Sequence, residues 1–123
     1  MCKVVITNVD TTALEVTKNL ILEVGGTSVA HILDVSDKAA VDAMIQKVVT
    51  EEGGLDYCVN NVEIQGVIAP LHEVSLSDWE STINVNLSSI FYWLQAQIKA
   101  LSASGGGNIV NVSSMGGLNV LLL

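Results

Sequence analysis

Apolar runs and amphipathic segments alternate along the whole chain. Residues 3–7 form a short β-branched run that predicts a strand, and residues 12–24 predict a helix that ends at Gly25 and Gly26. The apolar positions of this helix fall close to helical spacing, at Leu14, Val16, Leu20, Ile21 and Val24. The first two dozen residues therefore predict one strand–helix unit.

The same order repeats through the rest of the chain. Ser36 is a candidate N-cap for a second helix that runs to about residue 52. Ser77 and Glu80 have the spacing of a capping box, which we expect to open a long helix ending near residue 103. Further strands are predicted over 28–33, 55–59 and 108–112. Apolar strands separated by helices predict an α/β fold with a parallel sheet covered on both faces, in three αβα layers.

Composition narrows the function classes. The chain has 123 residues, is 50% hydrophobic, and carries a net charge of −8 with five Lys or Arg side chains in total. Every one of those five is lysine. This charge disfavours binding to nucleic acid or to an anionic membrane, since both depend on cationic side chains. No apolar run is long enough for a membrane span, so we expect a cytoplasmic protein.

The cysteines and histidines suggest neither a disulfide nor a metal site. Cys2 and Cys58 lie 56 positions apart in apolar, strand-like runs, where we expect buried reduced thiols. His31 and His72 stand without other ligands at metal-binding spacing. We therefore predict no metal.

Polar side chains follow each predicted strand. Asn8 and Asp10 follow the first strand, Asp34 the second, Asn60 and Asn61 the third, and a Ser113-Ser114 pair the fourth. Because the carboxyl ends of parallel strands meet at one edge of the sheet, this arrangement predicts a common ligand crevice there. The alternative, that such residues only cap helices and form turns, stays open for Asp10 and Ser36.

Two motifs carry a resemblance to a known family. The stretch 79–91, which includes Asn-Val-Asn-Leu-Ser-Ser-Ile-Phe, and the stretch 107–114, Gly-Asn-Ile-Val-Asn-Val-Ser-Ser, together resemble the middle of a short-chain dehydrogenase/reductase. The separations between Asp34, Asn60, Asn86 and Ser114 are 26, 26 and 28 residues, as successive strand–helix units require. The resemblance implies a partial NAD(P)-binding domain over 1–123, with an incomplete Rossmann-type sheet.

The resemblance implies five cofactor-binding residues. Asp34 and Val35 match the Asp-Val pair that places a carboxylate and a backbone amide against adenine, and Asn8 stands where the family usually has an acidic residue that holds the adenosine ribose. Asn60 and Asn61 match the first half of the family's Asn-Asn-Ala-Gly turn, whereas Val and Glu replace its small residues. Asparagine at position 8 tolerates NADP, yet the lack of arginine disfavours it, so NAD is slightly favoured.

Two residues match catalytic positions of the family. Asn86 aligns with the helix asparagine that holds a water in the proton relay, and Ser114 aligns with the serine that hydrogen-bonds the substrate carbonyl or hydroxyl. The family's glycine-rich loop has no counterpart after the first strand, because residues 7–12 contain no glycine. Its Tyr-x-x-x-Lys motif has none in 1–123, because neither Tyr57 nor Tyr92 has a lysine four positions later. We expect these elements to lie outside the segment.

That absence affects both fold and activity. In the family's strand order, the missing first strand lies between the first two and the last two strands predicted here. We expect these two pairs to join directly, to receive a strand from another chain, or to associate. The uncharged tail 118–123 adds an apolar patch to this expectation.

Three functions remain as alternatives. The first, which we favour, is part of an NAD(P)-dependent alcohol dehydrogenase or carbonyl reductase acting on a small alcohol or carbonyl compound, inactive as an isolated chain. The second is a non-catalytic scaffold or interaction protein that associates with a full-length relative. A homo-oligomer or a hetero-oligomer is possible. The third is a complete small enzyme with other chemistry, for which no nucleophile and base stand at suitable spacing.

Overall fold

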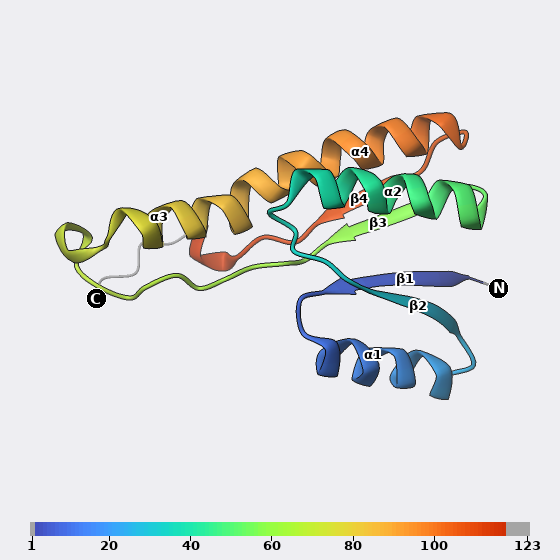
Figure 1. Cartoon of the computed structure of the whole chain (residues 1–123), viewed down its shortest axis with the longest axis horizontal. Coiled ribbons are helices and arrows are strands. Elements are labelled where there is room, and N and C mark those ends of the chain that lie inside the picture. The colour runs from blue at the N-terminus through green and yellow to red at the C-terminus, as the bar shows by residue number, and fades with distance from the viewer. Residues whose placement is uncertain (1, 118–123) are drawn as a thin grey trace.

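Four parallel strands and four α-helices make up the computed structural model, which describes residues 2–117 (Figure 1). The predicted apolar tail lies outside these residues. In chain order the elements are β1 (Lys3–Asn8), α1 (Thr11–Glu23), β2 (Thr27–Ile32), α2 (Lys38–Glu52), β3 (Tyr57–Asn60), α3 (Leu76–Ile83), α4 (Ser89–Ala103) and β4 (Asn108–Asn111). Every predicted strand is present, within two residues of its expected ends.

The strands form two separate parallel pairs. β1 pairs with β2 from Lys3 opposite Thr27 onward, and β3 pairs with β4 from Tyr57 opposite Asn108 onward. Within the described residues, no hydrogen bond joins the two pairs. The expectation that the pairs might join directly is therefore wrong, and the sheet is divided at its centre.

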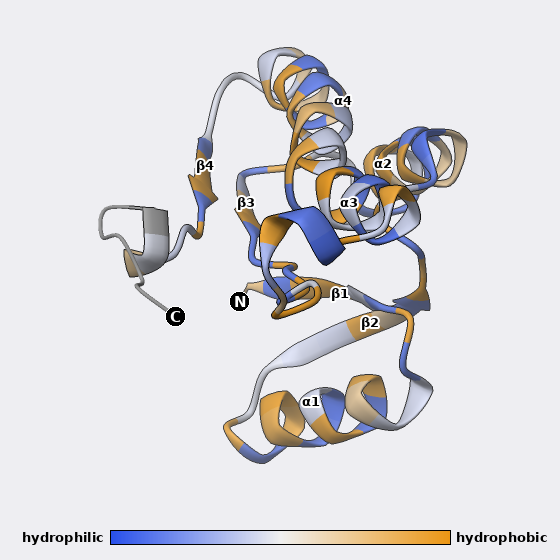
Figure 2. Cartoon of the chain, turned by 90° about the vertical axis from the view of Figure 1, so that its left-hand side faces the viewer, coloured by the Kyte–Doolittle hydropathy of each residue, from blue (hydrophilic) through white to orange (hydrophobic). Residues whose placement is uncertain are grey.

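Helices lie on both sides of the strands, as the sequence predicts. Figure 2 shows α1 on one side of β1 and β2, with α2, α3 and α4 on the other. The core lies between the strands and α2, where Leu33, Val35, Val41, Met44 and Val48 are buried together. Apolar burial of this kind is the main force that holds α2 and α4 on the strands.

Within the described residues, no helix covers the second face of β3. Tyr57 and Val59 are 72% and 66% exposed, whereas Cys58 and Asn60, which alternate with them, are buried beneath α4. Val59 is paired with Val110 of β4, which is itself 53% exposed. Among residues 2–117, helices thus cover one face of the pair β3–β4.

Local hydrogen bonding places two helix starts differently from the sequence prediction. The N-cap of α2 is Asp37, whose carboxylate accepts from Ala40 N at 3.0 Å, and Ser36 turns back to Asp34 instead. The N-cap of α3 is Ser75, whose Oγ accepts from Asp78 N at 3.1 Å. Aspartate and serine are both favoured N-cap residues, so when several lie near a helix start, the backbone conformation determines which of them caps the helix.

The long helix predicted to end near residue 103 is interrupted. A π-helical turn over Asn84–Ser88 separates α3 from α4, and Ser89 N donates to Asn84 O across it. Single π-turns within helices often occur at functional positions. This turn contains Asn86, one of the two predicted catalytic residues.

Candidate functional site

The carboxyl ends of β1 and β2 meet, as the common-crevice prediction requires. Leu33 N donates to Asn8 O at 3.0 Å, which holds the residues after β2 beside the end of β1. The Asn8 side chain accepts from Asp10 N at 3.1 Å, and Asp10 in turn caps α1 by accepting from Thr12 N and Ala13 N. Asp10 is therefore structural, whereas the exposed amide nitrogen of Asn8 has no hydrogen-bond partner among residues 2–117.

Asp34 uses one carboxylate oxygen within the protein. Its Oδ1 accepts from Ser36 Oγ at 2.7 Å and from Ser36 N at 2.9 Å. These two bonds, the side-chain one first, lower the pKa of the Asp34 carboxyl, and slight desolvation opposes them. Among the described residues, neither Asp34 Oδ2 nor the Val35 backbone N–H has a hydrogen-bond partner. The Val35 side chain is buried in the core, so this residue offers only its backbone.

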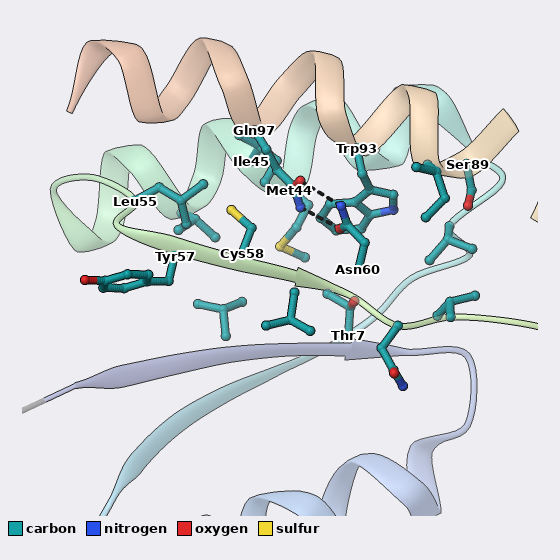
Figure 3. A pocket seen from close by; sticks show the side chains of 17 residues that line it. Thr7, Met44, Ile45, Leu55, Tyr57, Cys58, Asn60, Ser89, Trp93 and Gln97 are labelled. Carbon is teal, nitrogen blue, oxygen red and sulfur yellow. Dashed lines mark hydrogen bonds between the residues drawn. The ribbon is translucent and has the colours of Figure 1, made fainter. Parts of the chain in front are cut away.

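Asn60 makes three side-chain hydrogen bonds within the fold. Its Nδ2 donates to Gln97 Oε1 at 3.0 Å, and its Oδ1 accepts from Gln97 Nε2 at 2.8 Å (Figure 3). Asn60 Nδ2 also donates to Asn111 Oδ1 at 2.8 Å. Asn60 and Gln97 are 7% and 3% exposed. The Asn60 side chain is therefore committed to tying β3 to α4 and β4, whereas the neighbouring Asn61 is exposed.

Asn86 holds the loop that follows β3. Its Oδ1 accepts from Ile64 N at 2.9 Å and its Nδ2 donates to Ile64 O at 2.8 Å. This two-bond contact crosses 22 positions of sequence. The Asn86 side chain thus holds the loop, with one bond accepted by its amide oxygen and one donated by its amide nitrogen.

Ser114 lies at the carboxyl end of β4. It is exposed, and its Oγ accepts from Gly116 N at 3.1 Å. A hydroxyl that accepts one bond still has its own hydrogen to donate. Ser114 is therefore able to donate to a substrate oxygen.

The structure brings only part of the predicted site into one cavity. A cavity of about 140 Å³ lies between β1 and β3, and Val35, Asn60 and Asn61 are among its lining residues. Asn8, Asp34, Asn86 and Ser114 do not line it. This cavity is largely an internal gap between the two strand pairs, whereas the predicted residues lie along the carboxyl ends of the strands.

Sequence reasoning missed two members of the amide network. Gln97 lies 37 positions from Asn60, inside a helix in which no local pattern marks it. Asn111 belongs to the motif quoted above, but nothing in that motif indicates its partner. A polar residue at an otherwise buried helix position is the one signal that was available for Gln97.

The cysteines are both free, but only one is buried. Cys58 is buried, and this burial raises the pKa of its thiol, whereas Cys2 is exposed. The expected burial of Cys2 is wrong, because it precedes the first paired residue of β1. Within residues 2–117, no three His, Cys, Asp or Glu side chains cluster to hold a metal ion, and no helix is long and apolar enough to cross a membrane.

Comparison with known proteins identifies the family. A family model described as enoyl-(acyl carrier protein) reductase matches residues 2–122. A cyclohexanol dehydrogenase of Acinetobacter sp. (strain SE19) is 30% identical over 115 residues, which are 94% of this chain and 46% of that protein. The chain belongs to the short-chain dehydrogenase/reductase superfamily.

Other members of the superfamily agree in sequence and in fold. D-threitol dehydrogenase of Mycolicibacterium smegmatis is 41% identical over 98 residues, covering 77% of this chain and 37% of its own. The structure of NAD⁺-bound xylitol dehydrogenase matches with a TM-score of 0.89 at 27% identity, over 94% of this chain and 45% of that one. A metagenomic short-chain oxidoreductase in complex with NADP matches with a TM-score of 0.90 at 32% identity, over 97% and 54%.

These matches confirm the Rossmann-type, three-layer α/β fold that the sequence predicts. The chain spans about half the length, or less, of the short-chain dehydrogenases that it matches. Superfamily members of known structure bind NAD in one case and NADP in another, so the superfamily uses nicotinamide cofactors.

Proposed function

We propose that residues 1–123 form the adenosine-binding half of an NAD(P)-dependent alcohol dehydrogenase or carbonyl reductase, as one partial NAD(P)-binding domain. The observation that supports this proposal is the pair formed by Asp34 Oδ2 and the Val35 N–H. The two groups belong to adjacent residues just beyond the carboxyl end of β2, and neither has a partner among the described residues.

Adenine fits this pair chemically. Its Watson–Crick edge offers an amino donor beside a ring-nitrogen acceptor, which complement a carboxylate oxygen and a backbone N–H. The Ser36 bonds hold the Asp34 carboxylate in place and favour its ionised form. A fixed acceptor loses little conformational freedom when adenine binds, which favours affinity.

The ribose and the choice of dinucleotide depend on Asn8. Its exposed amide nitrogen is able to donate to a ribose hydroxyl, at the same strand end as Asp34. A 2′-phosphate would need cationic partners, and the chain has five lysines, no arginine and a net charge of −8. We therefore place NAD ahead of NADP.

Asn60 and Asn61 have different roles in this proposal. Because the Asn60 amide is bonded to Gln97 and Asn111, it positions the end of β3, and we assign the contact with the dinucleotide to the exposed Asn61 and the backbone around it. Asn86 positions the following loop through Ile64. Both asparagines are thus positioning residues.

The reaction class follows from the dinucleotide and from Ser114. When bound, the dinucleotide supplies or accepts a hydride at the substrate carbon. Ser114 donates a hydrogen bond to the substrate oxygen and so polarises a carbonyl or orients a hydroxyl. Neither Tyr57 nor Tyr92 stands with a lysine as a proton donor, so we expect no turnover by residues 1–123 alone.

The relatives suggest the class of substrate. Their names include a cyclohexanol dehydrogenase and a D-threitol dehydrogenase, both of which act on alcohols. We propose a small alcohol or the matching carbonyl compound, handled in the cytoplasm by a protein that binds neither nucleic acid nor membranes.

Asp34→Asn tests the assignment of adenine. The change keeps an oxygen for the Ser36 bonds and turns the free acceptor into a donor. We expect NADH to bind about tenfold more weakly, since one hydrogen bond is lost and two donors face each other. Asp42→Asn, on the surface of α2 where Asp42 pairs with Lys38, is the matched control and should bind as the unaltered chain does.

A hypoxanthine analogue of NADH sharpens the test. This analogue carries a carbonyl where adenine has its amino group, so Asp34→Asn should bind it better than the unaltered chain does. Calorimetry or cofactor fluorescence measures all four combinations. Equal loss of both dinucleotides in Asp34→Asn would contradict the contact with adenine.

A further inference from the structure

Asn60 joins the carboxyl ends of β3 and β4 to each other. Its backbone O accepts from Val112 N at 2.9 Å, and its side-chain Nδ2 donates to Asn111 Oδ1 at 2.8 Å. Both bonds lie just before Ser114, and Asn60 itself lies just before Asn61. The spacing between Asn61 and Ser114 therefore depends on how firmly Asn60 is held.

The Asn60 amide is held by Gln97 of α4. Figure 3 shows the two side chains directed toward each other, joined by hydrogen bonds of 3.0 and 2.8 Å. Two opposed bonds fix the plane of an amide as well as its position, and both side chains are buried, so water does not compete with the bonds. One hydrogen of Asn60 Nδ2 goes to Gln97, which leaves the other directed at Asn111.

The loop that follows β3 runs along the same helical segment. Ile64 exchanges two bonds with Asn86 in the π-helical turn. Gly66 lies so close to α3 that a Cβ there would come within 2.9 Å of Thr82 Oγ1. Figure 1 shows the loop passing beneath α4 and α3 in the direction opposite to theirs. Residues 61–63 are thus held at both ends, by the Asn60 amide pair before them and by Asn86 after them.

We propose that Gln97 is a positioning residue of the candidate site, a role that rests on the proposed function. Gln97 fixes Asn60, and Asn60 in turn fixes Asn61 beside the dinucleotide and Ser114 beside the substrate oxygen. In this assignment Gln97 touches neither ligand. It restricts the motion of the groups that do, and groups aligned in advance lose less conformational freedom when a ligand binds.

Amide hydrogen exchange tests the positioning without any dinucleotide. In Gln97→Met the bond from Val112 N to Asn60 O should open more often, and we expect Val112 N–H to exchange about tenfold faster relative to Leu33 N–H. Leu33 N–H, which is bonded to Asn8 O in the other strand pair, is the internal reference. Gln95→Met, at an exposed position of α4, is the matched control and should change neither rate. Equal acceleration at Val112 and Leu33 would show a global loss of stability and would overturn the proposal.

Calorimetry with NADH tests the link to binding. We expect Gln97→Met to bind NADH about fivefold more weakly, the equivalent of about one hydrogen bond. The stoichiometry should stay at one NADH per chain, because it reports the folded fraction whereas the dissociation constant reports the geometry of the site. An unchanged dissociation constant in Gln97→Met would overturn the proposal.

The double variant Gln97→Met, Asn60→Leu separates positioning from stability. An apolar pair then replaces the amide pair, and the exposed Asn111 is able to bond to water, so the free energy of unfolding should return close to that of the unaltered chain. The dissociation constant for NADH should stay raised, because the side-chain bond from β3 to Asn111 is absent. Affinity that recovers together with stability would show that the role of Gln97 is structural only.

The proposed function and the role of Gln97 fail in different ways. If Asp34→Asn weakens NADH binding and Gln97→Met does not, the role of Gln97 alone is wrong. If the unaltered chain does not bind NADH, the proposed function is wrong, and Gln97 is then a structural residue whatever the exchange rate of Val112 N–H.

Discussion

The pairing of Gln97 with Asn60 makes a quantitative prediction about stability. Gln97 is 3% exposed and exchanges two hydrogen bonds with the Asn60 amide, at 3.0 and 2.8 Å. Gln97→Met keeps nearly the same length and volume while it removes both bonds. Asn60 Nδ2 then still donates to Asn111, but Asn60 Oδ1 is left buried with no donor.

The magnitude follows from these losses. A hydrogen bond contributes about 1 kcal/mol net, and an orphaned buried acceptor costs about 1–3 kcal/mol, so we expect a loss of about 2–3 kcal/mol. Little is added for packing, since swaps that conserve volume cost less than about 1.5 kcal/mol. The free energy of unfolding, measured by urea denaturation followed by circular dichroism, reports the loss.

Gln95→Met is the matched control, because Gln95 lies on the same helix but is exposed. It should change the free energy of unfolding by less than about 0.5 kcal/mol. In an Asn60→Leu background, Gln97→Met should cost much less than in the unaltered chain, because the bonds are already gone. A Gln97→Met loss no larger than that of Gln95→Met would refute the energetic role of the amide pair.

Three further predictions concern local interactions. Ser36→Ala should raise the pKa of Asp34 toward its ordinary value, because the larger of the two bonds that lower it is lost; carboxyl NMR titration measures this, and an unchanged pKa would show that the bond does not act. A carboxyl whose pKa is lowered by folding stabilises the protein above its unfolded pKa of about 3.9, and this stabilisation is lost as the pH falls through the folded pKa. In Ser36→Ala the free energy of unfolding should therefore fall slightly less between neutral and acid pH. Asp10→Ala should cost about 1 kcal/mol of unfolding free energy by leaving Thr12 N and Ala13 N uncapped, whereas Asp10→Ser should cost less; equal losses would argue against capping. In a Cys2→Ser chain, Cys58 should react slowly with a thiol reagent until urea unfolds the protein, because burial both shields the thiol and raises its pKa; rapid reaction in the folded chain would contradict the burial of Cys58.

Helix capping shows where sequence reasoning loses resolution. Ser36 and Asp37 are adjacent and both suit an N-cap, as do Ser75 and Ser77 near the start of α3. Asp34 decides the first case, because its carboxylate takes the Ser36 hydroxyl and leaves Asp37 to cap the helix. Such competition among neighbouring polar groups depends on backbone direction, which a linear pattern does not specify.

The sequence also did not show which partners the side chains of the motif asparagines bind. The motif around Asn60 suggested contact with a cofactor, but its amide is bonded to Gln97 and Asn111 inside the fold. Asn86 likewise holds Ile64 with both of its polar atoms. A motif residue can contact a ligand itself or can position another residue that makes the contact. Which of the two it does depends on hydrogen-bond partners that are distant in sequence.

The sequence by itself determined the order of strands and helices, the parallel direction of the strands and the superfamily, because periodicity and strand-end residues are local properties. The tertiary structure alone decided that β1 and β3 do not pair, that Trp93 lines the cavity between them, and that Gln97 hydrogen-bonds Asn60. The physical reason is that strand pairing and burial are long-range: each depends on which segments meet in space, and the residues of one segment do not specify its neighbour.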